Sequence, residues 1–191
     1  MSLLRYVSRL TAAAAVSILI AAVPGLAAAQ DDVPAVWVPK HVQFVYQGFT
    51  THYSCDGLQD RIRDMLKKLG ARDLKVRQFG CVRQSGPTLF PGVQVDMRVL
   101  VPKSSAEATK AKDASSAVQA TWSNVVLMPA NASYDEQGDC ELIEQFKRTF
   151  LPLFTTRNVK YGSTCVPHQL TLGTHLSAEV LMPHRTAGNG S

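Results

Sequence analysis

The chain has 191 residues, and its 20 lysines and arginines against 15 aspartates and glutamates give a formal net charge of +5 at pH 7. This length suits one domain that can bury a hydrophobic core. So mild an excess of positive charge is not typical of proteins that bind nucleic acid through its phosphate backbone, and we expect no nucleic-acid partner.

Residues 1–29 have the three-part pattern of a secretory signal peptide. Arg5 and Arg9 precede an apolar, alanine-rich run over residues 10–23, and Ala27-Ala28-Ala29 is a cleavage signal built of small residues. The run is short for a membrane-spanning helix, which needs about 20 apolar residues. We therefore expect cleavage near Ala29 and an exported protein, periplasmic or extracellular, without a transmembrane segment. Loss of the two arginines lowers the formal charge to +3.

The first strand of the mature chain is predicted from His41 to Gln47, because Val42, Phe44 and Tyr46 alternate with the residues between them. The apolar run that precedes it ends at Pro39. Since proline donates no hydrogen bond to a sheet, the sequence predicts at most a short or edge strand before that residue.

A capped amphipathic helix is predicted next. Ser54 is a suitable N-cap, Asp56 adds negative charge to the first turn, and Gly70 is a suitable stop. One face of this helix carries apolar residues at helical spacing, namely Leu58, Ile62, Met65, Leu66 and Leu69. Strands are predicted to follow over residues 74–79 and 93–102, separated by a loop rich in glycine and proline.

Residues 103–117 are rich in alanine, serine and lysine, and they form either a solvated helix or a mobile excursion. A strand over residues 118–128 leads to a second helix that begins after Asp139 and is kinked or broken near Pro152. A return strand is predicted over residues 159–161, and a last strand or strand pair over residues 169–182. We expect a disordered tail over residues 184–191.

The two helical stretches predict an internal repeat. Setting Cys55 on Cys140 places the helix, the return strand and the later cysteine of one stretch over those of the other, with a single residue lost before the second cysteine. The prediction is one α+β domain over residues 30–183, built of two tandem β-α-β-β units over residues 41–102 and 120–183. Its helices should cover one face of an antiparallel or mixed sheet, and a ferredoxin-like sandwich is the nearest common architecture.

The four cysteines predict two disulfides, one in each unit, because an exported chain with an even number of cysteines rarely uses them as ligands or nucleophiles. A helix from Cys55 to Leu69 is about 21 Å long at 1.5 Å per residue. The return from Asp73 to Cys81 covers roughly 25 Å, at about 3.3 Å per residue. Of the three connectivities that four cysteines allow, this geometry favours Cys55–Cys81 and, by the same reasoning, Cys140–Cys165.

Candidates for chemistry are few. Eight basic residues cluster around the first unit and form a candidate anion-attracting patch: Arg61, Arg63, Lys67, Lys68, Arg72, Lys75, Arg77 and Arg83. Against this stands the ordinary interpretation, in which alternating charges simply solvate a helix face. His52, with Asp56 and Ser54 nearby in the sequence, is the one arrangement to examine for hydrolysis, although no nucleophile motif supports it.

The leading hypothesis is an exported, disulfide-stabilised module that binds a partner or supports an envelope structure, without catalytic or cofactor-binding residues. Its partner would be an anionic envelope component or another exported protein. Two alternatives stay open, a small exported hydrolase that uses His52 and a periplasmic metal-binding protein. The metal alternative lacks closely spaced ligands, since the five histidines form no recognisable metal motif.

Overall fold

This computed structural model describes residues 32–81, 90–110, 116–128, 139–163, 165–166 and 174–184. The predicted signal peptide, Arg83, residues 111–115 and the tail after His184 lie outside these ranges. The described elements are the strands β1 (Val33–Val45), β2 (Arg72–Phe79), β3 (Gly92–Pro102), β4 (Val118–Met128), β5 (Thr156–Gly162) and β6 (His175–Pro183), the helices α1 (Cys55–Lys68), α2 (Ala106–Lys110) and α4 (Cys140–Thr149), and the 3-10 turn η1 (Leu151–Leu153).

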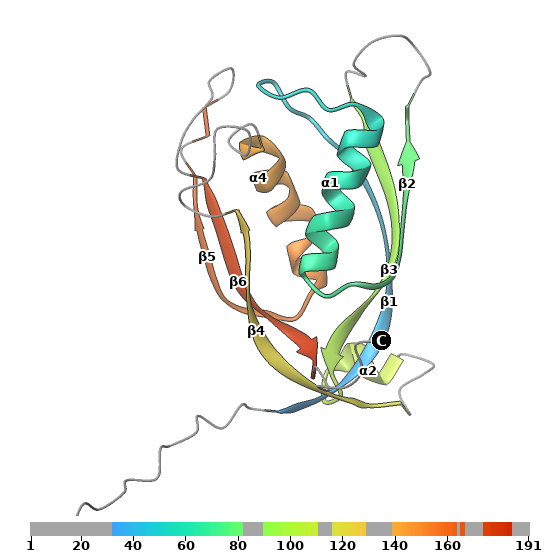
Figure 1. The fold of residues 1–191 in the computed structure, drawn as a ribbon. Coiled ribbons are helices and arrows are strands. Elements are labelled where there is room, and N and C mark those ends of the chain that lie inside the picture. Colours follow the sequence, from blue (N-terminus) through green and yellow to red (C-terminus); the bar gives the residue numbers. More distant parts are fainter. Residues whose placement is uncertain are drawn as a thin grey trace, which may run out of the picture.

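All six strands belong to one antiparallel sheet in the order β2-β3-β1-β4-β6-β5. β1 and β4 pair only through their first three residues, Val33–Ala35 and Val118–Ala120, and each strand then runs on past the start of the other. The sheet therefore has two arms, and Figure 1 shows α1 and α4 lying between them. The prediction of an α+β fold is confirmed, and the six-strand order differs from the four-strand sheet of a ferredoxin-like sandwich.

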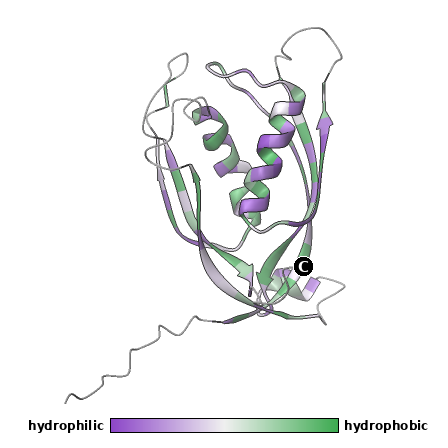
Figure 2. Cartoon of the chain, viewed as in Figure 1, coloured by the Kyte–Doolittle hydropathy of each residue, from purple (hydrophilic) through white to green (hydrophobic). Residues whose placement is uncertain are grey.

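The core fills the space between the helices and the two arms. The predicted apolar face of α1 is buried, and Ile143 and Phe146 of α4 are fully buried as well. Figure 2 shows hydrophilic and hydrophobic residues alternating around α1, as expected of a helix with one buried side. A smaller apolar cluster consists of Ala35, Leu100, Ala120 and Leu181, with Trp37 and Trp122 packed against it.

Helix α1 begins and ends as its sequence predicts. The Ser54 side chain accepts a hydrogen bond from the Gly57 amide at 3.1 Å. At the other end, Gly70 has a φ of 83° and donates to the Lys67 carbonyl, while Ala71 donates to the Leu66 carbonyl. This pair of bonds is the Schellman arrangement, which needs a residue in the left-handed conformation and so favours glycine at this position. The chain then turns directly into β2.

Pro39 does not end the first strand as predicted, because β1 runs through it to Val45. The amide of Tyr46 donates to the Pro91 carbonyl, and the amide of Lys103 donates to the Pro34 carbonyl. In an antiparallel pair alternate residues make these bonds, so the even-numbered residues of β1 bond to β3. Pro39 is odd-numbered, so its nitrogen faces away from β3. On that side of β1 the sheet needs no hydrogen-bond donor at this position.

The second helix ends at Thr149, and Pro152 lies in the 3-10 turn that follows, as the predicted break near that residue requires. Asp139 occupies the N-cap position of α4 but makes no side-chain cap bond. Residues 103–117 contain the short helix α2. Strand β6 covers part of the strand predicted over residues 169–182, and residues 169–173 lie outside the described ranges.

Both predicted disulfides are present. Cys55 bonds to Cys81 with 6.2 Å between the Cα atoms, and Cys140 bonds to Cys165 with 5.8 Å. Each joins the start of a helix to the far end of the strand that returns beside it. This confirms the pairing that the helix and strand lengths predict.

The two halves of the chain share the order strand, helix, strand, strand. Details also correspond: Asp73 and Asn158 have φ values of 49° and 51°, Arg72 lies over the Trp37 ring, and Arg157 over the Trp122 ring. The internal repeat itself stays a prediction. Among the described residues, no helix is long and apolar enough to cross a membrane.

Candidate anion-binding cleft

A half-open cleft of about 960 Å³ lies between the end of α1 and strand β4. It exists because β4 runs on past the start of β1, where Val33 is opposite Ala120, while the tight turn at Gly70 carries the chain into β2. Its lining comes from the last turn of α1, the start of β2, one edge of β4 and the end of β6, and consists of Lys67, Lys68, Gly70, Ala71, Arg72, Thr121, Ser123, Asn124, Val125, Val126, Met182, Pro183 and His184.

The lining residues carry positive charge without a carboxylate among them. Lys67 and Lys68 are exposed, and within the described part of the chain no acidic side chain forms an ion pair with either. The guanidinium of Arg72, which also lines the cleft, lies 4.6 Å from the centre of the Trp37 ring in a cation–π contact. At the His184 end of the cleft, Asp32 Oδ1 lies 3.9 Å from His184 Nε2.

Polar groups that could bind an anion also line this cleft. The hydroxyls of Thr121 and Ser123 and the amide of Asn124 can each donate a hydrogen bond. Ammonium and guanidinium groups bind carboxylate and phosphate oxygens through charge-assisted hydrogen bonds. The arrangement can therefore hold an anionic group, while the methyl groups of Val125, Val126 and Met182 provide apolar contact.

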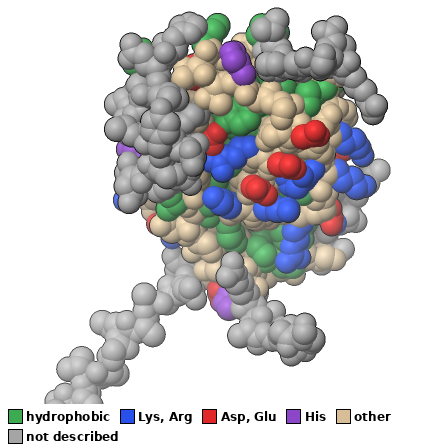
Figure 3. Space-filling view, turned by 45° about the horizontal axis from the view of Figure 1, so that its top comes forward, with side chains coloured by type: hydrophobic (Ala, Val, Ile, Leu, Met, Phe, Trp, Pro, Cys, Tyr) green, Lys and Arg blue, Asp and Glu red, His purple; other side chains and the backbone are tan. Residues whose placement is uncertain are grey.

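The other members of the predicted basic patch are not gathered at this cleft. Arg61 points inward to Asp139, Arg63 pairs with Asp60 on α1, and Arg77 pairs with Asp96 on β3. Lys75 is exposed on β2, beside the strand position of Asp96, and Arg83 lies outside the described residues. Figure 3 shows basic and acidic side chains interspersed on one face of the molecule rather than an unbroken basic surface.

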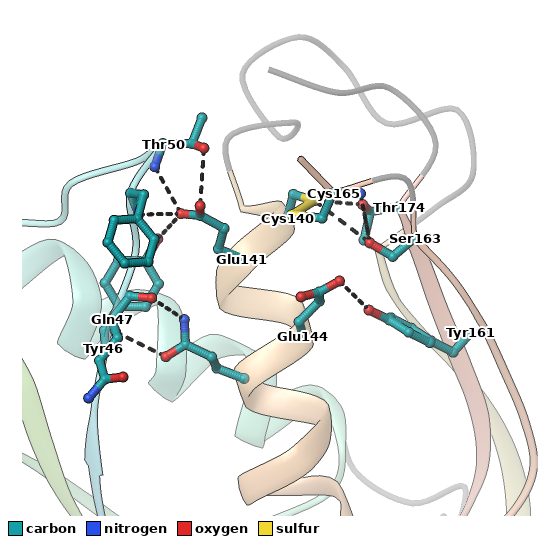
Figure 4. Close-up of a disulfide and its surroundings, with 12 residues drawn as sticks. Tyr46, Gln47, Thr50, Cys140, Glu141, Glu144, Tyr161, Ser163, Cys165 and Thr174 are labelled. Atoms are coloured by element: carbon teal, nitrogen blue, oxygen red, sulfur yellow. Dashed lines mark hydrogen bonds between the residues drawn. A yellow bond between two sulfur atoms is a disulfide. The ribbon is translucent and has the colours of Figure 1, made fainter. Parts of the chain in front are cut away.

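A buried polar network, which the sequence gives no reason to expect, joins the two halves at the start of α4. The Glu141 carboxylate accepts hydrogen bonds from the amides of Phe49 and Thr50, at 2.8 and 3.0 Å, and from the Thr50 hydroxyl at 3.1 Å (Figure 4). The Tyr46 hydroxyl donates to the Thr51 carbonyl and lies 3.3 Å from Glu141 Oε2. Glu141 therefore fastens the loop before α1 to helix α4.

Asp139 lies beside this network. Its carboxylate accepts from the Tyr53 hydroxyl and pairs with Arg61 of α1. Burial raises the pKa of Asp139 to about 6. Burial, and then the neighbouring Glu141 carboxylate, also raise the pKa of Tyr46. These groups are enclosed between loop and helices, and the contacts recorded for them connect parts of the fold, as expected of groups that stabilise the structure.

The described contacts do not assemble a hydrolase site around His52. His52 is exposed, and among the described residues no hydrogen bond or ion pair links it to Ser54 or Asp56. The Ser54 hydroxyl caps α1, and the Asp56 carboxylate accepts from Gln78. The sequence neighbours that suggested catalysis are thus engaged in structural contacts.

The histidines that the structure describes do not converge either. His41 lies 2.7 Å from Asp96, and His184 is at the cleft, whereas His168 falls outside the described ranges. Within those ranges no group of three or more histidine, cysteine, aspartate or glutamate side chains is placed to hold a metal ion.

No protein-family model, curated protein or solved structure matches this chain.

Proposed function

We propose that the chain is an exported binding module, without catalytic residues, whose cleft between α1 and β4 binds an anionic group of its partner. The observation that carries this proposal is the lining of the cleft, which has Lys67, Lys68 and Arg72 and no carboxylate. The partner would be an anionic component of the cell envelope or another exported protein.

Export is part of the same proposal. Two disulfides are compatible with an oxidising compartment outside the cytosol. The signal-peptide pattern over residues 1–29 supports release near Ala29, to the periplasm or the medium.

We further infer that the two halves are an internal repeat, one β-α-β-β unit followed by a second. The support is their common element order, the similar span of each disulfide, and the matching pairs Arg72 with Trp37 and Arg157 with Trp122. The cleft is a point of difference, because the last two residues of α1 are Lys67 and Lys68, while the aligned positions of the second half are Pro152 and Leu153.

The test is binding of fluorescently labelled poly-L-glutamate to the exported, oxidised protein at low and high salt. We expect binding that weakens as salt rises, and that falls about tenfold or more in a double variant, Lys67→Glu with Lys68→Glu. Lys103→Glu with Lys110→Glu is the matched control, since it makes the same change of net charge at exposed lysines outside the cleft. Equal losses in the two double variants would mean that net charge, not the cleft, attracts the probe.

A further inference from the structure

The side of β4 that faces the cleft has backbone groups that bond to no described residue. The amide of His184 donates to the Gln119 carbonyl, and β4 and β6 keep that register as far as Val126. Because alternate residues bond across an antiparallel pair, Thr121, Ser123 and Val125 bond to β6. The amides and carbonyls of Trp122, Asn124 and Val126 therefore point the other way. Beyond Ala120 β1 does not pair with them, and no other described residue is recorded as their backbone partner.

A second hydrogen bond supports this assignment. The Leu181 amide donates to the Thr155 carbonyl, so it points away from β4. Leu181 is opposite Trp122 in the register, and these two residues form a pair without hydrogen bonds between them. The open edge is thus a consequence of where β1 begins, since its first residue, Val33, is opposite Ala120.

The corresponding edge of β1 is closed by its sequence. Ala35, opposite Val118, is the last residue of β1 that pairs with β4, and Ala120, opposite Val33, is the last residue of β4 that pairs with β1. Trp37 and Trp122 come two positions later on the two strands, and Pro39 and Asn124 two positions after them. Pro39 has no amide hydrogen to offer at its edge, and proline is a common way to prevent strand addition. Asn124 has a backbone amide hydrogen at the equivalent position, and it lines the same cleft as Lys67 and Lys68.

We propose that the partner binds as an extended acidic polypeptide segment that adds a strand to the open edge of β4. Its backbone would bond to Trp122, Asn124 and Val126, and its carboxylates would contact Lys67, Lys68 and Arg72. Strand addition gives affinity through main-chain hydrogen bonds, and the side chains along the cleft give specificity. The charge of the cleft favours glutamate and aspartate, and the exposed side chain of Val126 favours an apolar residue between them. This inference rests on the anion-binding function proposed above.

The test uses isothermal titration with an eight-residue peptide that alternates glutamate with valine or threonine. Asn124→Pro removes the central amide of the open edge and leaves the bonds between β4 and β6, as Pro39 does in β1. Asn124→Ala is its matched control, because it changes the side chain and keeps the amide. We expect the proline variant to bind the peptide about fivefold to tenfold more weakly than the alanine variant, and both to be folded by circular dichroism.

A second pair of probes tests the backbone of the ligand. Two isomers of the peptide carry N-methyl groups on alternate amides, one on the glutamates and one on the residues between them. One isomer should lose about tenfold in affinity and the other should bind as the parent does, because a strand presents alternate amides to its neighbour. Equal affinities of the two isomers would overturn strand addition.

The outcomes separate this inference from the proposed function. If Lys67→Glu with Lys68→Glu weakens binding but Asn124→Pro does not, the cleft binds anions and strand addition is wrong. Binding of inorganic polyphosphate as tight as that of the peptide, equally in the proline and alanine variants, would favour a non-peptide envelope polymer and also overturn it. A dimer in size-exclusion chromatography that excludes the peptide would show that a second copy occupies the edge. If Lys67→Glu with Lys68→Glu binds like the wild type, the proposed function is wrong, and this inference falls with it.

Discussion

Replacing Glu141 with alanine should destabilise the protein strongly, although the residue lies in the first turn of a short helix. The side chain is 8% exposed and accepts hydrogen bonds from two backbone amides and a hydroxyl of the loop before α1. Bonds to a charged acceptor contribute about 1.5 to 3 kcal/mol each, but water can replace part of them in a half-buried loop. We therefore expect Glu141→Ala to lower the free energy of unfolding by about 3 kcal/mol and the Tm by about 6 to 12 °C.

The assay is urea unfolding followed by circular dichroism, with the disulfides intact. Glu144→Ala is the control, because Glu144 is on the same helix and accepts one hydrogen bond, from Tyr161 at 3.0 Å. We expect that variant to lose about 1 kcal/mol or less. A loss below about 1 kcal/mol for Glu141→Ala, or equal losses in the two variants, would refute the view that Glu141 fastens the two halves together.

Two further predictions concern buried groups. Burial raises the pKa of Asp139 to about 6, so its contribution to stability is greatest when it is protonated and is lost as the pH rises from about 4 through 6. Relative to the wild type, the unfolding free energy of Asp139→Asn should therefore rise by on the order of 2 kcal/mol between pH 4.5 and pH 7. A difference in unfolding free energy that does not change with pH would contradict this. Cys55→Ser should lower the unfolding free energy by about 2 to 5 kcal/mol and leave Cys81 open to alkylation, whereas mass spectrometry that finds Cys81 still blocked would mean that the native partner is different.

The sequence predicts most of the local structure, because local rules decide it. The apolar face of α1, the cap at Ser54 and the turn at Gly70 are each set by residues within a few positions of one another, and the structure agrees with all three. The disulfide pairing also follows, since the lengths of a helix and its returning strand leave little choice.

What the sequence does not reveal depends on contacts between distant segments. Pro39 predicts the end of a strand, but its nitrogen faces an edge of β1 where no hydrogen-bond donor is needed. Which edge the nitrogen faces is known only from the pairing of β1 with β3. Asp139 is in a cap position, yet Arg61 and Tyr53 approach it from the other half. The cleft also depends on contacts in the folded structure. The sequence does not distinguish the eight basic residues from one another, whereas ion pairs in the structure neutralise Arg61, Arg63 and Arg77.

The most direct test of the binding cleft is amide hydrogen exchange, resolved by residue, on β4 with and without the acidic peptide. In the free protein, the amides of Trp122, Asn124 and Val126 should exchange at least about tenfold faster than those of Ser123 and Val125, which bond to β6. Adding the peptide should slow the three fast amides and leave β1 unchanged. Slow exchange at all five amides in the free protein, or protection by the peptide elsewhere, would contradict an open edge beside a basic cleft.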